Sequence, residues 1–175
     1  MTQDSLKAQK ILCLQTTSEE TTIELGRALG ATLMKTAPAR SVTVLLSGDL
    51  GTGKTTLVRG IGDALGAARV RSPSFTLVNE YRTADMTIVH ADLYRLDSGG
   101  VDGLGLDEYQ EAGCILLVEW PDRWTDTPTH DALNILIEAT NENERVLEIS
   151  SLGGTGDLVL QDLRESINGI KNGKS

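Results

Sequence analysis

The stretch GDLGTGKTT, residues 48–56, contains the residue types that bind a chain of phosphates. Gly48, Gly53, Lys54 and Thr55 fill the pattern G-x-x-x-x-G-K-[ST]. In such a loop the glycines let backbone N–H groups point at phosphate oxygens, at the positive end of a helix. The lysine reaches the β- and γ-phosphates, and the threonine hydroxyl suits Mg²⁺, which takes about six oxygen ligands. The stretch therefore predicts a site for a nucleoside triphosphate and magnesium.

Two acidic residues follow apolar runs and are candidates for the chemistry beside this loop. Asp92 follows TIVHA, and Glu119 follows CILLV. Either carboxylate could bind magnesium, directly or through water, and either could orient an attacking water. The spacing alone leaves these two roles unassigned. His90, two residues before Asp92, and His130, in a polar stretch, are interpreted as structural.

The segment RSPSFTLVNEY, residues 71–81, is rich in hydroxyl groups. Ser72, Ser74 and Thr76 could each donate to a phosphate or bind magnesium, as in the loops that sense the γ-phosphate in nucleotide switches. An ordinary Ser-Pro turn leading into a strand explains the same residues equally well. Both interpretations stay open.

The elements that must position these residues follow from the hydrophobic pattern. SVTVLL at 41–46 predicts a buried strand before the glycine loop, and a helix over 54–65 is expected after it. A further helix begins at Thr17 or Ser18, and a C-terminal helix covers 158–171. The other predicted strands are 10–16, 76–81, 86–92, 114–120, 132–139 and 145–151. The last two alternate apolar and polar residues, which indicates an antiparallel hairpin.

This order of elements predicts an α/β fold, a three-layer domain of the P-loop NTPase type. We expect a mostly parallel central sheet with the antiparallel hairpin near the C-terminus. Residues 1–156 are predicted to form a single ATPase domain. Residues 157–175 are predicted to form a C-terminal helix and a frayed tail.

The composition excludes several classes of function. The chain has 16 basic and 25 acidic residues and a net charge of −9, which argues against direct binding of DNA or RNA through released counterions. The N-terminal segment lacks the apolar region of a signal peptide, and no apolar run reaches membrane-spanning length. Cys13 and Cys114 share no metal-ligand spacing and are interpreted as reduced thiols. We therefore expect a cytoplasmic protein without a membrane partner.

Several separated blocks resemble one family. GDLGTGKTT, RG at 59–60, SPSFTLV at 72–78, HADLYRL at 90–96 and VEWP at 118–121 occur in this order. Together they resemble the tRNA threonylcarbamoyladenosine biosynthesis protein TsaE family of P-loop ATPases, over about residues 17–150. The resemblance implies a magnesium-dependent ATPase, slow alone, that works with TsaD and TsaB homologues. Those partners transfer a threonylcarbamoyl group to adenosine in tRNA, which the ATPase meets only through the complex.

The resemblance also implies roles for individual residues. Lys54 neutralises phosphate charge, and Asp92 orients water or the water shell of the metal. Thr55 and Glu119 bind Mg²⁺. The residues implied to contact ATP are Glu19, Asp49, Leu50, Gly51, Thr52, Gly53, Lys54, Thr55, Thr56, Ser74, Trp120 and Arg145.

The chain departs from the family pattern at two positions. Ser74 stands where the family usually has threonine, which keeps the hydroxyl group. Ala91 stands where the family usually has phenylalanine, which removes an aromatic ring but spares the neighbouring acid. Neither change removes a group that the implied chemistry needs.

Two other functions share the glycine loop. A small-molecule kinase needs a lid with arginines over the phosphates, and the one long flexible segment, 97–113, contains no arginine or lysine. A GTPase switch reads guanine with an Asn-Lys-x-Asp segment, and the nearest match, TNEN at 140–143, lacks the lysine and the aspartate. The kinase is the main alternative.

Overall fold

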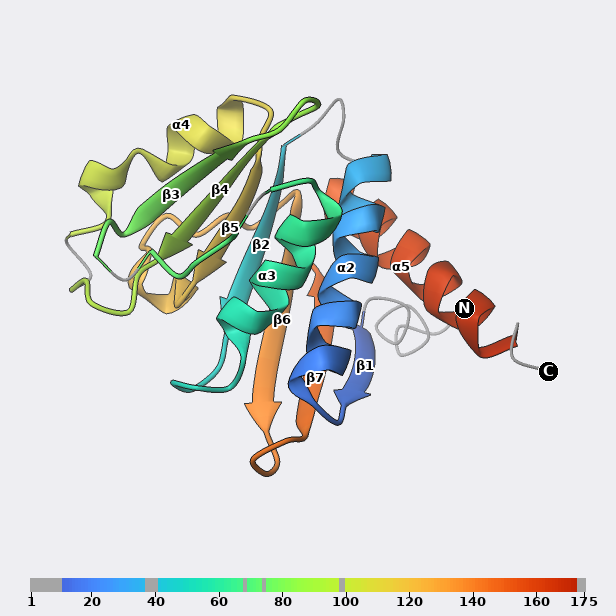
Figure 1. Ribbon diagram of the computed structural model, residues 1–175. Helices are drawn as coiled ribbons and strands as arrows, with labels where there is room; N and C mark the ends of the chain where they lie inside the picture. The colour runs from blue at the N-terminus through green and yellow to red at the C-terminus, as the bar shows by residue number, and fades with distance from the viewer. Residues whose placement is uncertain (1–10, 37–40, 68, 74, 98–99, 173–175) are drawn as a thin grey trace, which may run out of the picture.

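A computed structural model describes residues 11–36, 41–67, 69–73, 75–97 and 100–172. They form one sheet of seven strands with helices on both faces (Figure 1). The strands are β1 (Ile11–Thr16), β2 (Val42–Ser47), β3 (Val78–Arg82), β4 (Thr87–Asp92), β5 (Ile115–Glu119), β6 (Ala132–Ala139) and β7 (Arg145–Ser151). The helices are α2 (Glu19–Thr36), α3 (Lys54–Ala64), α4 (Leu106–Glu111) and α5 (Thr155–Asn172), with 3-10 turns η1 (Asp102–Leu104) and η2 (Pro121–Arg123).

The sheet is mixed, with the strand order β1-β7-β6-β2-β5-β4-β3. The four central strands, β6, β2, β5 and β4, are parallel to one another. The pairs β1–β7, β6–β7 and β3–β4 are antiparallel. The prediction of parallel strands is therefore right for the centre, and the predicted antiparallel hairpin is the pair β6–β7; the antiparallel pairs β1–β7 and β3–β4 were not predicted, so the sheet is less parallel than expected. Short turns explain β3–β4 and β6–β7, because only antiparallel strands can be joined without a long crossover.

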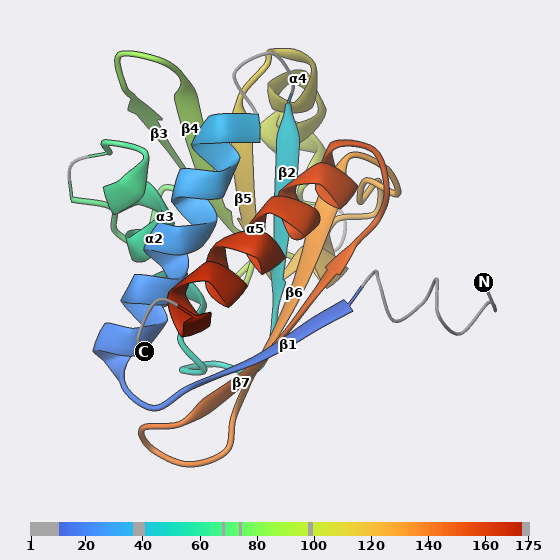
Figure 2. The ribbon, with the colours of Figure 1, turned by 90° about the vertical axis from the view of Figure 1, so that its right-hand side faces the viewer.

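Helices cover both faces of the sheet, so the domain has three layers. Helices α2, α3 and α5 pack on one face, and α4 lies on the other (Figures 1 and 2). The strands supply alternate side chains to the two faces. In β2, Val44 and Leu46 belong to the larger core cluster under α2, α3 and α5, and Leu45 belongs to the smaller cluster under α4. The sheet therefore lies between the two core clusters.

Helices α2 and α3 touch through their backbones. A Cβ atom added to Gly26 would lie 2.4 Å from the Leu57 carbonyl oxygen, and one added to Gly60 would lie 2.2 Å from the Ile23 carbonyl oxygen. Glycine is therefore the one residue that fits at this crossing. The crossing fixes α3, whose first turn follows the glycine loop, against the neighbouring helix.

The two long outer helices, α2 and α5, begin close to their predicted starts. In α2 the Thr21 backbone N–H donates to the Ser18 hydroxyl oxygen at 3.1 Å, so Ser18 is the cap. Helix α5 begins at Thr155, three residues before the predicted start at 158, so the predicted division after residue 156 lies in its first turn. Its residues Val159 and Leu163 are fully buried in the larger core cluster. None of the described helices combines the length and apolar character that crossing a bilayer requires.

Candidate functional site

The glycine loop connects β2 to α3, as the sequence predicts. Gly48 and Gly53 have φ angles of 136° and 104°, in the region that favours glycine. A Cβ atom added to Gly48 would lie 2.2 Å from the Ile137 carbonyl oxygen, so β6 also leaves no space for a side chain there. The loop conformation thus depends on these two glycines.

The N-terminus of α3 is open. Its cap residue, Gly53, offers no side-chain hydrogen bond, and the first turn contains no acidic residue. The first N–H groups of a helix have no partners within the helix, and the helix dipole gives them a partial positive charge. This end of α3 can therefore accept an anion such as a phosphate.

Lys54 lies at this open end and is almost completely buried, with 4% of its surface exposed. Its Nζ donates to the carbonyl oxygens of Gly48 at 2.7 Å and Asp49 at 2.8 Å. The same atom lies 4.2 Å from the ring centroid of Trp120. Burial lowers the pKa of Lys54, and the carboxylates of the site, Glu119 above all, oppose that shift. An entering phosphate could replace the two carbonyl contacts.

Thr55 and Glu119 form the oxygen-rich part of the site. The Thr55 hydroxyl donates to Glu119 Oε1 at 2.9 Å, and Glu119 is 3% exposed. Hydroxyl and carboxylate oxygens suit a hard cation such as Mg²⁺, which usually takes few protein ligands and completes its shell with water and phosphate. Within the described residues no group of three or more His, Cys, Asp or Glu side chains is arranged so that it could hold a metal ion by itself. The donor set therefore fits magnesium better than a metal held by protein ligands alone.

Asp92 lies beside Glu119, because the two residues are register partners at the ends of β4 and β5. Its two oxygens are both held. Ser72 Oγ donates to Oδ2 at 3.0 Å, and the Tyr94 backbone N–H donates to Oδ1 at 3.2 Å. A carboxylate held in this way can accept a hydrogen bond from a water in the adjoining cavity.

Trp120 follows Glu119 in an unusual conformation. Its φ angle of 61° is left-handed, which costs about 1–3 kcal/mol for a residue other than glycine. The backbone N–H donates to the Leu46 carbonyl oxygen at 3.1 Å, which ties the turn to β2. The ring lies 5.0 Å from the Tyr94 ring, centroid to centroid, and the Lys54 ammonium lies over its face. The strained backbone thus places an aromatic wall beside the lysine.

A cavity of about 420 Å³ opens between these groups. The sequence-predicted residues that line it are Leu50, Gly51, Gly53, Lys54, Thr55, Thr56, Asp92, Glu119 and Trp120. Ser72, Tyr94 and Arg95 line it as well. Tyr94 and Arg95 had no predicted role, although both lie in the block HADLYRL; Ser72 was one of three hydroxyl candidates. Among those candidates, Ser74 lies outside the described residues, and Thr76 instead donates to Asn79 Oδ1 at 2.8 Å.

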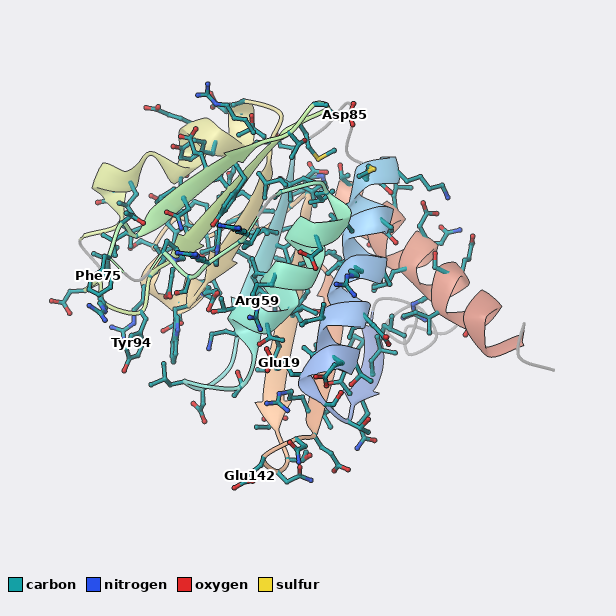
Figure 3. All side chains as sticks on the ribbon, in the orientation of Figure 1. Glu19, Arg59, Phe75, Asp85, Tyr94 and Glu142 are labelled. Atoms are coloured by element: carbon teal, nitrogen blue, oxygen red, sulfur yellow. The ribbon has the colours of Figure 1, made fainter. Side chains whose placement is uncertain are left out.

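Four other predicted residues lie around this cavity without lining it. Asp49 and Thr52 line a smaller cavity of about 350 Å³ between the loop and β6. Arg145 Nε donates to the Thr52 carbonyl oxygen at 3.2 Å, so the arginine braces the outer side of the loop. Glu19 forms an ion pair with Arg59, and Figure 3 shows Glu19 at the start of α2 and Arg59 on the neighbouring α3, in the middle of that helix.

Comparisons with known proteins agree on one family. The family model for "Threonylcarbamoyl adenosine biosynthesis protein TsaE" matches residues 16–147. A tRNA threonylcarbamoyladenosine biosynthesis protein TsaE from Nostoc sp. is 38% identical over 165 residues, covering 91% of this chain and 98% of the relative. The protein of the same name from Aquifex aeolicus is 41% identical over 135 residues, covering 75% of this chain and 90% of the relative. A crystal structure of Bacillus subtilis YdiB superposes with a TM-score of 0.74 at 29% identity, covering 90% of this chain and 96% of that one.

Proposed function

The chain belongs to the TsaE family of threonylcarbamoyl adenosine biosynthesis proteins, and from this premise we propose that it is a magnesium-dependent ATPase that supports threonylcarbamoyl transfer to adenosine in tRNA. One observation carries the proposal. The open N-terminus of α3 lies next to a buried lysine and to the hydrogen-bonded pair Thr55 and Glu119. Together these groups offer an anion site and a cation site side by side, which is what a magnesium nucleotide needs.

In this proposal the phosphates of ATP bind at the glycine loop. The backbone N–H groups of residues 49–56 and the ammonium of Lys54 contact the phosphate oxygens. Thr55 and Glu119 hold Mg²⁺, directly or through its water shell. The ion, when bound, neutralises charge on the phosphates. Arg145 braces the outer side of the loop and Glu19 stands at the start of α2, and in this proposal the adenine binds on this side of the site.

Hydrolysis needs an oriented water and stabilisation of the transferred phosphoryl group. Asp92 is the group proposed to orient the water, since its carboxylate is held by Ser72 and by the Tyr94 backbone beside the cavity. Lys54 stabilises the negative charge that develops on the phosphate oxygens. The water oxygen forms a bond to the γ-phosphorus as the bond to the bridging oxygen breaks, a proton of the water is released to solvent, and the products are ADP and inorganic phosphate.

The proposed partners are homologues of TsaD and TsaB, which carry out the transfer to tRNA. The relatives of this chain carry names that assign the relatives themselves to the biosynthesis of threonylcarbamoyladenosine. A net charge of −9 favours an indirect relation to tRNA through the complex over direct binding. In this proposal the energy of ATP hydrolysis resets the partner enzyme.

The test is hydrolysis of ATP by the purified chain, alone and with TsaB and TsaD homologues from the same organism. Parallel reactions contain GTP and a panel of small phosphate acceptors. Slow release of phosphate to water that changes when the partners are added supports the proposal. Transfer of phosphate to an acceptor, with no effect of the partners, establishes a small-molecule kinase instead.

A further inference from the structure

We propose that His90 is a positioning residue that holds the magnesium ligand Glu119 in its binding orientation. The inference rests on the proposed function, because it concerns the cation of the same site. His90 lies on β4 and Glu119 on the neighbouring strand β5. His90 Nε2 lies 2.9 Å from Glu119 Oε1, and the His90 side chain is fully buried.

The carboxylate of Glu119 is fixed through one of its two oxygens. His90 Nε2 and the Thr55 hydroxyl both contact Oε1, each at 2.9 Å. Among the described residues no hydrogen bond to Oε2 is present, and Glu119 lines the cavity. Two donors on one oxygen fix the rotation of the carboxylate and leave Oε2 for a cation or its water.

The direction of the contact follows from the chemistry of the carboxylate. An ionised carboxylate only accepts hydrogen bonds, so Nε2 of His90 must carry the hydrogen. His90 Nδ1 is then buried without a hydrogen-bond partner among the described residues. A buried polar atom without a partner destabilises the folded state. An apolar side chain would avoid this penalty, so packing alone does not account for a histidine here.

The surroundings of His90 support the same conclusion. Its strand neighbours Val89 and Ala91 are fully buried and apolar. Ile88, two residues earlier and on the same face, belongs to the larger core cluster under α3. His90 is thus a polar residue inserted in an apolar strand, on the face that carries Asp92. Its described polar contact goes to Glu119, which links it to the site.

Three substitutions separate positioning from packing. His90→Gln keeps an amide N–H close to the place of the imidazole Nε2, whereas the shorter amide of His90→Asn reaches the place of Nδ1. His90→Leu removes both polar atoms and keeps an apolar volume. The asparagine and glutamine variants are a matched pair, because they differ by one methylene group and carry the same functional group.

The measurement is the affinity for Mn²⁺, a paramagnetic substitute for Mg²⁺, in the presence of ADP, followed by electron paramagnetic resonance. Affinity for ADP in excess EDTA and the melting temperature are recorded for each variant. We expect His90→Asn and His90→Leu to weaken Mn²⁺ binding about 10-fold, the lower end of the effect of removing a partner of a metal ligand. Affinity for ADP without metal stays at the parent value, and His90→Gln recovers most of the Mn²⁺ affinity.

Two results overturn the inference. Parent-like Mn²⁺ affinity in the asparagine and leucine variants shows that His90 does not position the ligand. Equal losses in all three variants, together with weaker binding of ADP without metal, show a general structural role. The parent chain separates this failure from failure of the proposed function. If the parent itself shows no metal-dependent binding of nucleotide, both the proposed function and the role of His90 are wrong. If the parent shows such binding and the variants give either of the two results above, only the role of His90 is wrong.

Discussion

The two ends of the central strands carry cavities of the same size that are lined by different kinds of residue. Each measures about 420 Å³. The cavity at the carboxyl ends contains the glycine loop, Lys54 and the two acids. The cavity at the amino ends is lined by Ser41, Thr43, Gln110, Pro128, His130, Asp131 and Thr155. Size alone therefore does not indicate which end is the candidate nucleotide site.

The difference lies in the two helices that begin at these ends. Helix α3 begins with Gly53 and has no side-chain cap. Helix α5 begins against Asp131, whose Oδ1 accepts from the Thr155 backbone N–H at 2.6 Å and from the Thr155 hydroxyl at 2.8 Å. A carboxylate of the protein already occupies the positive end of α5. Of these two helix ends, only that of α3 is left open for an external anion.

Burial of charge separates the two ends further. Lys54 and Glu119 are 4% and 3% exposed, whereas the side chains of His130 and Asp131 are 69% and 47% exposed. Burying an ionised group lowers the stability of the folded state unless the group is paired with an opposite charge, hydrogen-bonded or bound to a metal ion. The carboxyl end keeps two such groups beside a cavity, which is the pattern of a functional site.

The largest effect is expected from Lys54→Ala, which removes the cation at the open helix end. We expect hydrolysis of ATP to fall at least about 100-fold, because a preorganised donor to the developing charge is lost. Phosphate release and calorimetric titration with ATP measure the effect. Thr43→Val, in the cavity at the amino ends, is the control and should leave both unchanged. A similar loss in Thr43→Val would contradict the assignment of ATP hydrolysis to the cavity that contains Lys54.

Asp92→Ala is expected to spare binding of ATP and slow its hydrolysis about 100-fold, since orienting a water matters mainly in the transition state. Single-turnover kinetics with saturating ATP measure the chemical step. Ser72→Ala removes one of the two described hydrogen bonds to Asp92 and should give a smaller loss of the same kind. An Asp92 variant that turns over ATP at the parent rate would remove this residue from the mechanism.

Glu119→Gln keeps the shape of the side chain and removes its charge. We expect the magnesium concentration for half-maximal hydrolysis to rise about 10-fold, which corresponds to about 1.4 kcal/mol. A magnesium titration of the initial rate measures it. The same magnesium dependence in variant and parent would exclude Glu119 from the metal shell.

Asp131→Ala tests the other end of the strands. Loss of the contact to the first turn of α5 should lower the free energy of unfolding by about 1 kcal/mol, the usual effect of losing a helix cap. For a chain of this length that is a fall of about 2–4 °C in the melting temperature. Calorimetry measures it, and the rate of ATP hydrolysis should stay at the parent value. A fall in the rate with no fall in stability would mean that the two ends communicate.

The smallest effect concerns pH. Because burial lowers the pKa of Lys54, the unfolded chain binds more protons than the folded chain between that lowered value and the ordinary value of 10.5. The contribution of Lys54 to stability therefore rises with pH across this window. Urea unfolding of the parent and of Lys54→Met, at neutral pH and near pH 10.5, should show the parent gaining stability relative to the variant. Parallel pH profiles would contradict the lowered pKa of Lys54 in the folded chain.

Local features of the sequence predict the strand, the glycine loop and the helix at residues 41–65, because φ restrictions and hydrophobic runs act within a few residues. They also placed Asp92 and Glu119 at the ends of their strands. Predicted and observed bounds differ little at β4, β6 and β7. The block-by-block resemblance then supplied the family, which the comparisons confirm.

Which of these residues come into contact depends on the pairing of strands that are distant in the sequence. The order of the sheet makes Asp92 and Glu119 register partners, and it brings His90 onto the Glu119 carboxylate. It also turned Arg145 and Glu19 toward the rim of the site instead of its cavity. The physical reason is that hydrophobic periodicity reports which side chains are buried, whereas the pairing of distant strands depends on contacts that no local pattern encodes. Sequence determined the parts of the site, and the pairing of β4 with β5 assembled them.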